Sequence, residues 1–133
     1  MIVVDTHVLI WWVNGDGGLS KAAAKAIDRE IHSENGVVLV SSITAWEIAM
    51  LVARERLTLA MSIDDWLREV GDIDGIRFVP VDNDVAVAST RLPGDFHKDP
   101  ADRLIVALAR HSNASLVTAD EKIHDYKHVR SIW

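Results

Sequence analysis

Short runs of apolar residues recur along the chain, separated by longer segments of mixed character. Runs of this length, without a polar residue at every second position, are typical of strands buried on both faces of a sheet. The pattern therefore predicts strands at Ile2–Val4, Val37–Val40, Ile76–Val81 and Ser115–Thr118, with Val129–Ile132 as a last strand at the edge.

The segments between these runs carry apolar residues at a spacing of three to four positions, which predicts helices. Ser20 and Ser62 precede two of them as N-caps, with Asp65 completing a capping box, and Pro93–Gly94 ends a third. The predicted helices cover Leu19–Ser33, Ile43–Arg54, Ser62–Asp72, Asn83–Leu92, Ala101–Ser112 and a short stretch after Asp120.

Alternation of buried strands with helices indicates the α/β class, with a parallel sheet covered by helices on both faces. The chain shows no internal repeat, low-complexity tract or linker, so we expect a single domain over residues 1–133. In open α/β sheets, ligands bind beyond the carboxyl ends of the strands. Side chains that directly follow strands are therefore the first candidates for a functional site.

Asp5 directly follows the first predicted strand and is the only charged residue from Met1 to Gly15 when His7 is counted as neutral. A carboxylate among apolar neighbours costs free energy unless it is paired or binds a cation. Two interpretations stay open at this position. Asp5 is a ligand in a site, or it caps a short helix through Val8–Val13.

Glu47 is the only charged side chain from Val37 to Ala53. Residues three and four positions away share its face of the predicted helix, so they show whether that face is solvated. They are mostly apolar, which indicates a partly buried carboxylate, although an edge position open to water is the alternative. These neighbours are Ile43, Thr44, Met50 and Leu51.

Asp102 and Asp120 each have a structural explanation as well as a functional one. Asp99 is a good N-cap, Pro100 suits the first helical position, and Asp102 falls at the capping-box position. Asp102 nevertheless shares its helix face with apolar residues and is expected to point inward. Asp120 follows the strand that ends at Thr118, and it also suits the N-cap of the next helix.

The four acids together support a hypothesis that none supports alone. All of them are expected to converge at one edge of one sheet, where mutual repulsion would raise their pKa values. A hard divalent cation relieves that repulsion, and Mg²⁺ or Mn²⁺ prefers oxygen ligands of this kind. Such clusters serve phosphodiester hydrolysis, in which one metal activates a water and a second stabilises the leaving oxygen.

Composition adjusts this picture in three ways. The 133 residues contain no Cys, which excludes disulfides and thiolate metal sites. The net charge of −6 is unusual for a nucleic-acid binder, although four of the acids belong to the candidate site. The acidic net charge is compatible with a basic partner protein. No basic leader and no membrane-spanning apolar run is present, so we expect a cytoplasmic protein without a membrane partner.

Four segments, in order and properly spaced, resemble those of the PIN-domain ribonucleases and in particular the VapC-type toxins of toxin–antitoxin pairs. They are Val3–Trp12, Ser41–Ile48, His97–Ile105 and Leu116–Asp120, and the resemblance runs nearly end to end. It implies a five-stranded parallel sheet between helices and a Mg²⁺-dependent endoribonuclease, with Mn²⁺ as a substitute. It also implies a homodimer silenced by a cognate VapB-like antitoxin, and metal-binding catalytic acids at Asp5, Glu47, Asp102 and Asp120.

Neighbouring polar residues are candidates for supporting roles. The hydroxyls of Thr6, Ser42 and Thr118 are placed to orient the acids or to satisfy local backbone groups. Arg103, next to Asp102, is expected either to hold a phosphate or to pair with an acid. Asp99 is assigned to capping.

Two other classes of protein use an acid after the first strand. Phosphatases with an Asp nucleophile require a second Asp two residues later, where this chain has His7. Receiver-like magnesium-binding modules require paired acids there and an Asp after the central strand, where this chain has Ser41–Ser42. Both remain alternatives at this point.

Overall fold

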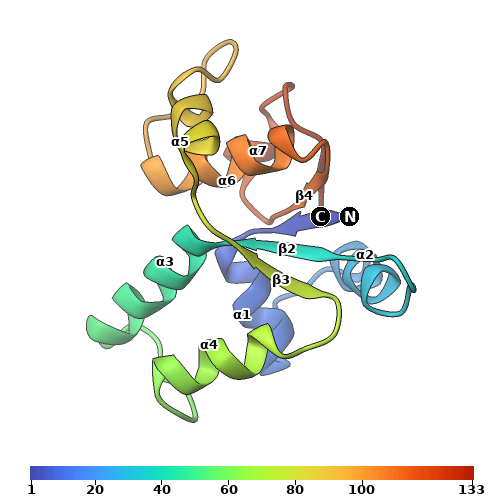
Figure 1. Ribbon diagram of the computed structural model, residues 1–133, viewed down its shortest axis with the longest axis vertical. Coiled ribbons are helices and arrows are strands. Elements are labelled where there is room, and N and C mark those ends of the chain that lie inside the picture. The colour runs from blue at the N-terminus through green and yellow to red at the C-terminus, as the bar shows by residue number, and fades with distance from the viewer.

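The structure is a computed structural model that describes residues 1–133 (Figure 1). Five strands and seven helices alternate along the chain. The strands are β1 (Ile2–Val4), β2 (Val38–Ser41), β3 (Ile76–Val79), β4 (Ser115–Val117) and β5 (Ser131–Ile132). The helices are α1 (Thr6–Asn14), α2 (Lys21–Ile31), α3 (Ser42–Ala53), α4 (Ile63–Gly71), α5 (Asn83–Thr90), α6 (Pro100–His111) and α7 (Glu121–His124).

The five strands form one parallel sheet in the order β3-β2-β1-β4-β5. The chain first moves outward from β1 to β3 and then returns to add β4 and β5 on the other side of β1. The direction of winding therefore reverses between β1 and β4. This switch point is where an open α/β sheet leaves a crevice at the carboxyl ends of its strands.

Helices cover both faces of the sheet, as Figure 1 shows: α1 to α4 lie on one side and α5 to α7 on the other. Alternate side chains of each central strand point into separate cores. Val4 and Val38 pack with the first group of helices, and Val3 and Leu39 pack with the second. The predicted parallel sheet, buried on both faces, is confirmed.

Local signals explain where several helices begin. The hydroxyls of Ser20 and Ser62 accept from the backbone N–H groups of Ala23 and Asp65, as predicted. The second half of the Ser62 capping box is not made, because the Asp65 carboxylate instead accepts from Arg68. None of the helices combines the length and apolar character that a membrane crossing requires.

Candidate active site

Asp5 lies just beyond β1 with both of its carboxylate oxygens engaged. Its Oδ1 accepts from the backbone N–H of Thr6 at 2.8 Å and caps α1. Its Oδ2 accepts from the hydroxyl of Thr118, which follows β4, at 2.7 Å. The two interpretations of Asp5 are therefore compatible, since one carboxylate starts a helix and also joins the ends of the two strands at the switch point.

Glu47 reaches the same region from the middle of α3. The buried hydroxyl of Thr6 donates to Glu47 Oε1 at 2.6 Å and lies 3.0 Å from the hydroxyl of Thr44, which is also buried. Burial raises the pKa of Glu47 and the negative charge of Asp5 raises it further, whereas the Thr6 hydrogen bond opposes the shift. Glu47 is thus a half-buried acid held in place by a neighbouring hydroxyl.

Asp102 occupies the first turn of α6. Its backbone N–H donates to the Asp99 carboxylate at 3.1 Å, which makes Asp99 the N-cap as predicted. The Asp102 side chain points toward His97, whose Nε2 lies 3.1 Å from Oδ2. That contact is not aligned as a hydrogen bond, so the buried His97 Nε2 has no hydrogen-bond partner.

The pKa of Asp102 is raised to about 7. Burial is the main cause, and the negative charges of four neighbouring carboxylates raise it further. At neutral pH the cluster therefore carries more negative charge than the protein itself compensates. These four neighbours are Asp5, Asp99, Asp120 and Glu47.

Asp120 follows β4 after two residues and caps α7 by accepting from the Lys122 N–H at 2.9 Å. Its own N–H donates to the Thr118 hydroxyl, which in turn donates to Asp5. One side-chain oxygen from Asp120, one from Asp102 and a ring nitrogen of His97 lie within 4.8 Å of one another.

One cavity of about 420 Å³ collects all four candidate acids. It lies beyond the carboxyl ends of β1 and β4, as an open α/β sheet requires. Asp5, Glu47, Asp102 and Asp120 share its walls with His7, Val8, Trp11, Asp99 and Ala119.

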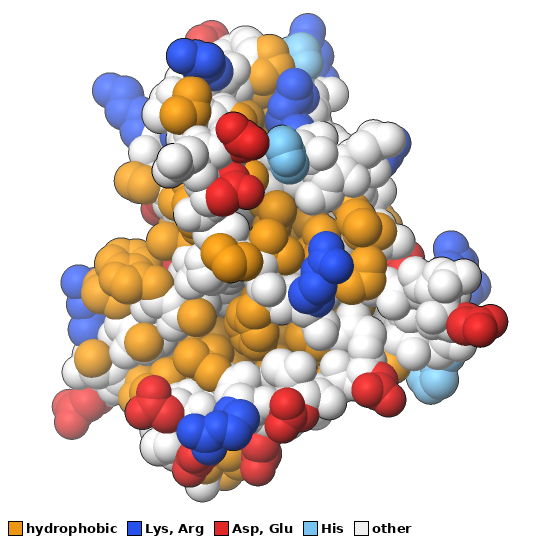
Figure 2. Space-filling model, viewed as in Figure 1, with side chains coloured by type: hydrophobic (Ala, Val, Ile, Leu, Met, Phe, Trp, Pro, Cys, Tyr) orange, Lys and Arg blue, Asp and Glu red, His pale blue; other side chains and the backbone are white.

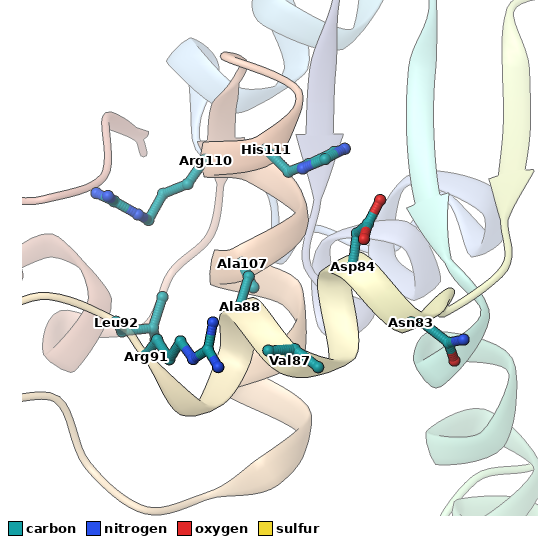
Figure 3. Close-up of a pocket in the computed structure, with 9 residues that line it drawn as sticks. All are labelled: Asn83, Asp84, Val87, Ala88, Arg91, Leu92, Ala107, Arg110 and His111. Atoms are coloured by element: carbon teal, nitrogen blue, oxygen red, sulfur yellow. The ribbon is translucent and has the colours of Figure 1, made fainter.

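A second cavity, of about 550 Å³, is lined by residues of α5 and α6 and has a different character (Figure 3). Its only acid is Asp84, and its cationic side chains are Arg91 and Arg110. None of the four candidate acids lines it. The four acids therefore meet at the switch point and not in the cavity beside α5 and α6.

Residues 2–129 of the sequence match the family described as the PIN domain. This match covers nearly the whole chain and includes all the strands except β5. The chain belongs to the PIN domain family. Nucleases of this family generally depend on a divalent metal.

Among curated proteins, this PIN domain is 34% identical over 131 residues to Ribonuclease VapC22 of Mycobacterium tuberculosis. The matched region covers 98% of this chain and 95% of the relative. At this sequence identity and coverage, the similarity is one of sequence along nearly the whole chain and not of the fold alone.

Solved structures with the same fold come from several toxin–antitoxin systems. VapBC2 from Rickettsia felis, bound to a promoter DNA fragment, matches with a TM-score of 0.71 and 17% identity, covering 98% of this chain and 97% of that chain. FitAcB from Neisseria gonorrhoeae matches with a TM-score of 0.67 and 21% identity, covering 98% and 96%. VapC20 of Mycobacterium tuberculosis, a toxin that cleaves the sarcin–ricin loop, matches with a TM-score of 0.61 and 17% identity, covering 98% and 99%.

Two of the four supporting candidates contact the acids. Thr6 and Thr118 bind Glu47 and Asp5 directly. The Ser42 hydroxyl instead accepts from the N–H of Val81 and ties the start of α3 to the segment after β3. Of the two roles expected for Ser42, it therefore has the one of satisfying a backbone group and does not orient an acid.

Arg103 also has a structural role in place of the expected contact with a phosphate or an acid. Its guanidinium donates to the backbone carbonyls of Ser89, Phe96 and His97. Successive residues on a helix do not share a face, so the inward position of Asp102 directs Arg103 elsewhere. Arg103 holds the segment that brings His97 beside Asp102.

The sequence reasoning missed His97 as a member of the site. The only available signal was its position, because His97 lies five residues before Asp102 in the segment His97–Ile105. Its approach to Asp102 depends on the path of the loop before α6, which Arg103 fixes through tertiary hydrogen bonds.

Replacing Thr6 with Val should raise the pKa of Glu47 further, because the hydrogen bond that favours its ionised form is lost. A change of about tenfold in the ionisation constant is the expected size for one such bond. Carbon-13 NMR titration of the Glu47 carboxyl measures it. Thr6→Ser is the matched control and should keep the parent value; an unchanged Glu47 pKa in Thr6→Val would contradict the assigned bond.

Proposed function

We propose that this PIN domain is a divalent-metal-dependent endoribonuclease toxin that is held inactive by a cognate antitoxin. The observation that carries the proposal is the convergence of Asp5, Glu47, Asp102 and Asp120 on one cavity at the switch point of the sheet. Similarity to a ribonuclease over nearly the whole chain supports RNA as the substrate class.

The residues of the cavity fit a divalent cation. Four carboxylates offer hard oxygen ligands, and burial together with the neighbouring negative charges raises the pKa of Asp102. The unpartnered Nε2 of His97 offers a nitrogen ligand beside Asp102, which a transition metal such as Mn²⁺ accepts more readily than Mg²⁺ does. When bound, such a cation supplies charge stabilisation at the phosphate and a water of lowered pKa.

The chain's own residues would prepare this site through a short network of hydroxyls. Thr118 joins Asp5 to the backbone of Asp120, so the acids after β1 and β4 keep a fixed separation. Thr6 favours the ionised form of Glu47 and holds it toward the cavity. Hydrogen bonds from neighbouring hydroxyls orient the carboxylates that bind a metal.

An Asp nucleophile is a weaker explanation for the same residues. A nucleophilic carboxylate needs an oxygen free to attack, and both oxygens of Asp5 are hydrogen-bonded to Thr6 and Thr118. The phosphatase and receiver-like alternatives also do not account for Glu47 and Asp102 in the same cavity.

The acidic cavity also supports a basic antitoxin as the partner of this protein. A cognate VapB-like antitoxin with a basic segment would neutralise the carboxylates and block access of RNA. Toxin–antitoxin complexes among the proteins of similar fold agree with a partner of this class. We further propose a homodimer, as expected from the resemblance to VapC-type toxins.

Cleavage of a labelled, structured RNA pool tests the proposed activity. The purified protein should cut in Mg²⁺ or Mn²⁺ and not with chelator, and Asp5→Asn should lower the rate by at least about a thousandfold. Asn at position 5 keeps a helix cap, so the fold is expected to survive. Asp84→Asn, which removes an acid from the α5–α6 cavity, is the control and should keep full activity. Equal cleavage by the parent and Asp5→Asn would overturn the proposal.

A further inference from the structure

Trp46 places a large aromatic ring in water directly beside the candidate active site. Its side chain is 55% exposed, more than any other large hydrophobic side chain of the protein. The next residue in α3 is Glu47, one of the four acids. An exposed indole at this position has no role in the core, so it is available to a ligand.

Trp46 belongs to a groove of about 230 Å³ on the outer side of α3, here called the α3 groove. Two of its residues, His7 and Glu47, also line the acidic cavity, so the groove and the cavity share a wall. A ligand that extends out of the cavity past Glu47 therefore enters the α3 groove. Its other lining residues are Trp46, Met50, Leu51, Arg54 and Arg56.

Arg54 and Arg56 give the α3 groove a positive end. Both are exposed, and the structure contains no hydrogen bond or ion pair to either guanidinium. On the face shown in Figure 2, hydrophobic and basic side chains lie together over the region of α3. This local positive charge stands out because the protein as a whole has a net charge of −6.

The turn after α3 fixes where the two arginines lie. The N–H of Arg56 donates to the carbonyl of Leu51, and the N–H of Glu55 donates to that of Val52. This is the Schellman arrangement, with Glu55 in the left-handed region at φ 56°. The backbone of Arg54 and Arg56 is therefore held at the end of the groove before any ligand binds.

We propose that the α3 groove binds an unpaired nucleotide of the RNA substrate next to the scissile phosphate. The base stacks on Trp46, and neighbouring phosphates pair with Arg54 and Arg56. An aromatic face combined with a cationic track is the usual equipment for single-stranded nucleic acid. This inference rests on the proposed ribonuclease function and names the residues that would hold the base and phosphates beside the scissile bond.

Binding to a catalytically silenced protein tests this assignment without cleavage. Fluorescence anisotropy in Mg²⁺ is measured for Asp5→Asn with a labelled single-stranded RNA of mixed sequence and with the corresponding duplex. Adding Trp46→Leu, which keeps apolar bulk but loses the π-face, should weaken single-strand binding about tenfold. Adding Trp46→Phe, which keeps a ring, should retain most of it. Because Trp46 is exposed, both variants are expected to fold.

The arginines are tested through salt dependence in the same background. Removing both Arg54 and Arg56 should reduce the slope of log K against log salt by about 1.4, or about 0.7 for each phosphate contact. Arg29→Ala, which removes an exposed arginine of α2 whose guanidinium makes no hydrogen bond, should leave the slope unchanged.

Two outcomes would overturn the inference. If Trp46→Leu leaves the RNA affinity unchanged, Trp46 does not stack on a base. The same conclusion follows if Trp46→Leu and Trp46→Phe both bind RNA normally but bind an antitoxin more weakly. Either result leaves the proposed function intact if the parent still cuts RNA and Asp5→Asn does not. If the parent cuts no RNA but its RNA binding still depends on the ring of Trp46, the role of the α3 groove stands and the proposed function is overturned.

Discussion

Replacing Asp102 with Asn should stabilise the metal-free protein while abolishing its nuclease activity. Burial, and then the repulsion of the neighbouring carboxylates, raises the pKa of Asp102 from 3.8 to about 7. A tenfold change in an ionisation constant corresponds to about 1.4 kcal/mol, so relief of burial and repulsion should contribute roughly 2–4 kcal/mol above neutral pH. The ionised Asp102 gains only about 0.3–1 kcal/mol from the α6 dipole, too little to reverse this sign.

The pH dependence gives this prediction a distinctive form. Unfolded Asp102 ionises above about pH 4 and folded Asp102 only above about pH 7, so the folded state binds more protons between these values. The parent should therefore lose stability as the pH rises through this window. Asn does not titrate, so the advantage of Asp102→Asn should grow across the window and then level off.

Urea unfolding with chelator present, at several pH values from about 4 to 8, measures this difference. Asp84→Asn is the matched control, because it removes an exposed acid from α5 that lies outside the cluster. A difference between parent and Asp102→Asn that stays constant with pH would contradict the assigned repulsion.

Divalent metal should raise the melting temperature, and the effect should increase as the pH rises through about 7. A cation requires ionised carboxylates, so protons compete with it at Asp102. At a metal concentration of one hundred times Kd, binding to the folded state alone contributes about 2.7 kcal/mol. For a domain of this size that corresponds to a shift of roughly 10 °C.

Thermal unfolding with Mg²⁺, Mn²⁺ or chelator checks the linkage. The shift should be small in Asp5→Asn and Asp102→Asn and should persist in Asp84→Asn. An equal shift in all four proteins would show that the metal binds outside the acidic cavity, and no shift at millimolar metal would count against a metal site altogether.

The strands were the most predictable part of the fold, because residues buried on both sides leave a continuous apolar run. Ile2–Val4 was predicted with its observed ends. The third strand was predicted to reach Val81 but ends at Val79, since Pro80 has no N–H to offer the sheet and the Val81 N–H donates to Ser42. Such ends depend on contacts that an apolar pattern does not record.

Helix α1 was considered only as an alternative explanation for Asp5. Its residues Thr6–Asn14 are mostly β-branched, aromatic or otherwise apolar, so neither propensity nor a polar face marks a helix. The cap at Asp5 and the left-handed Gly15 mark its two ends in the structure. Only His7 and Asn14 of α1 are exposed, which weakens the usual amphipathic signal.

The four acids could be selected from the sequence because each interrupts an apolar stretch or follows a strand. Their shared cavity follows from sheet topology, which the alternation of elements already indicates. The position of His97 and the structural role of Arg103 could not be found in this way. They depend on a loop whose path is set by hydrogen bonds between residues 6 to 14 positions apart.

The hydrogen bond between Thr118 and Asp5 joins residues 113 positions apart in the chain. During synthesis, an emerging polypeptide holds Asp5, Glu47 and Asp102 before β4 and the residues after it supply Thr118 and Asp120. The complete acidic cluster therefore assembles only after β4 has been made and has paired with β1. A chain truncated before β4 would keep three of the four acids without the hydroxyl that joins Asp5 to Asp120.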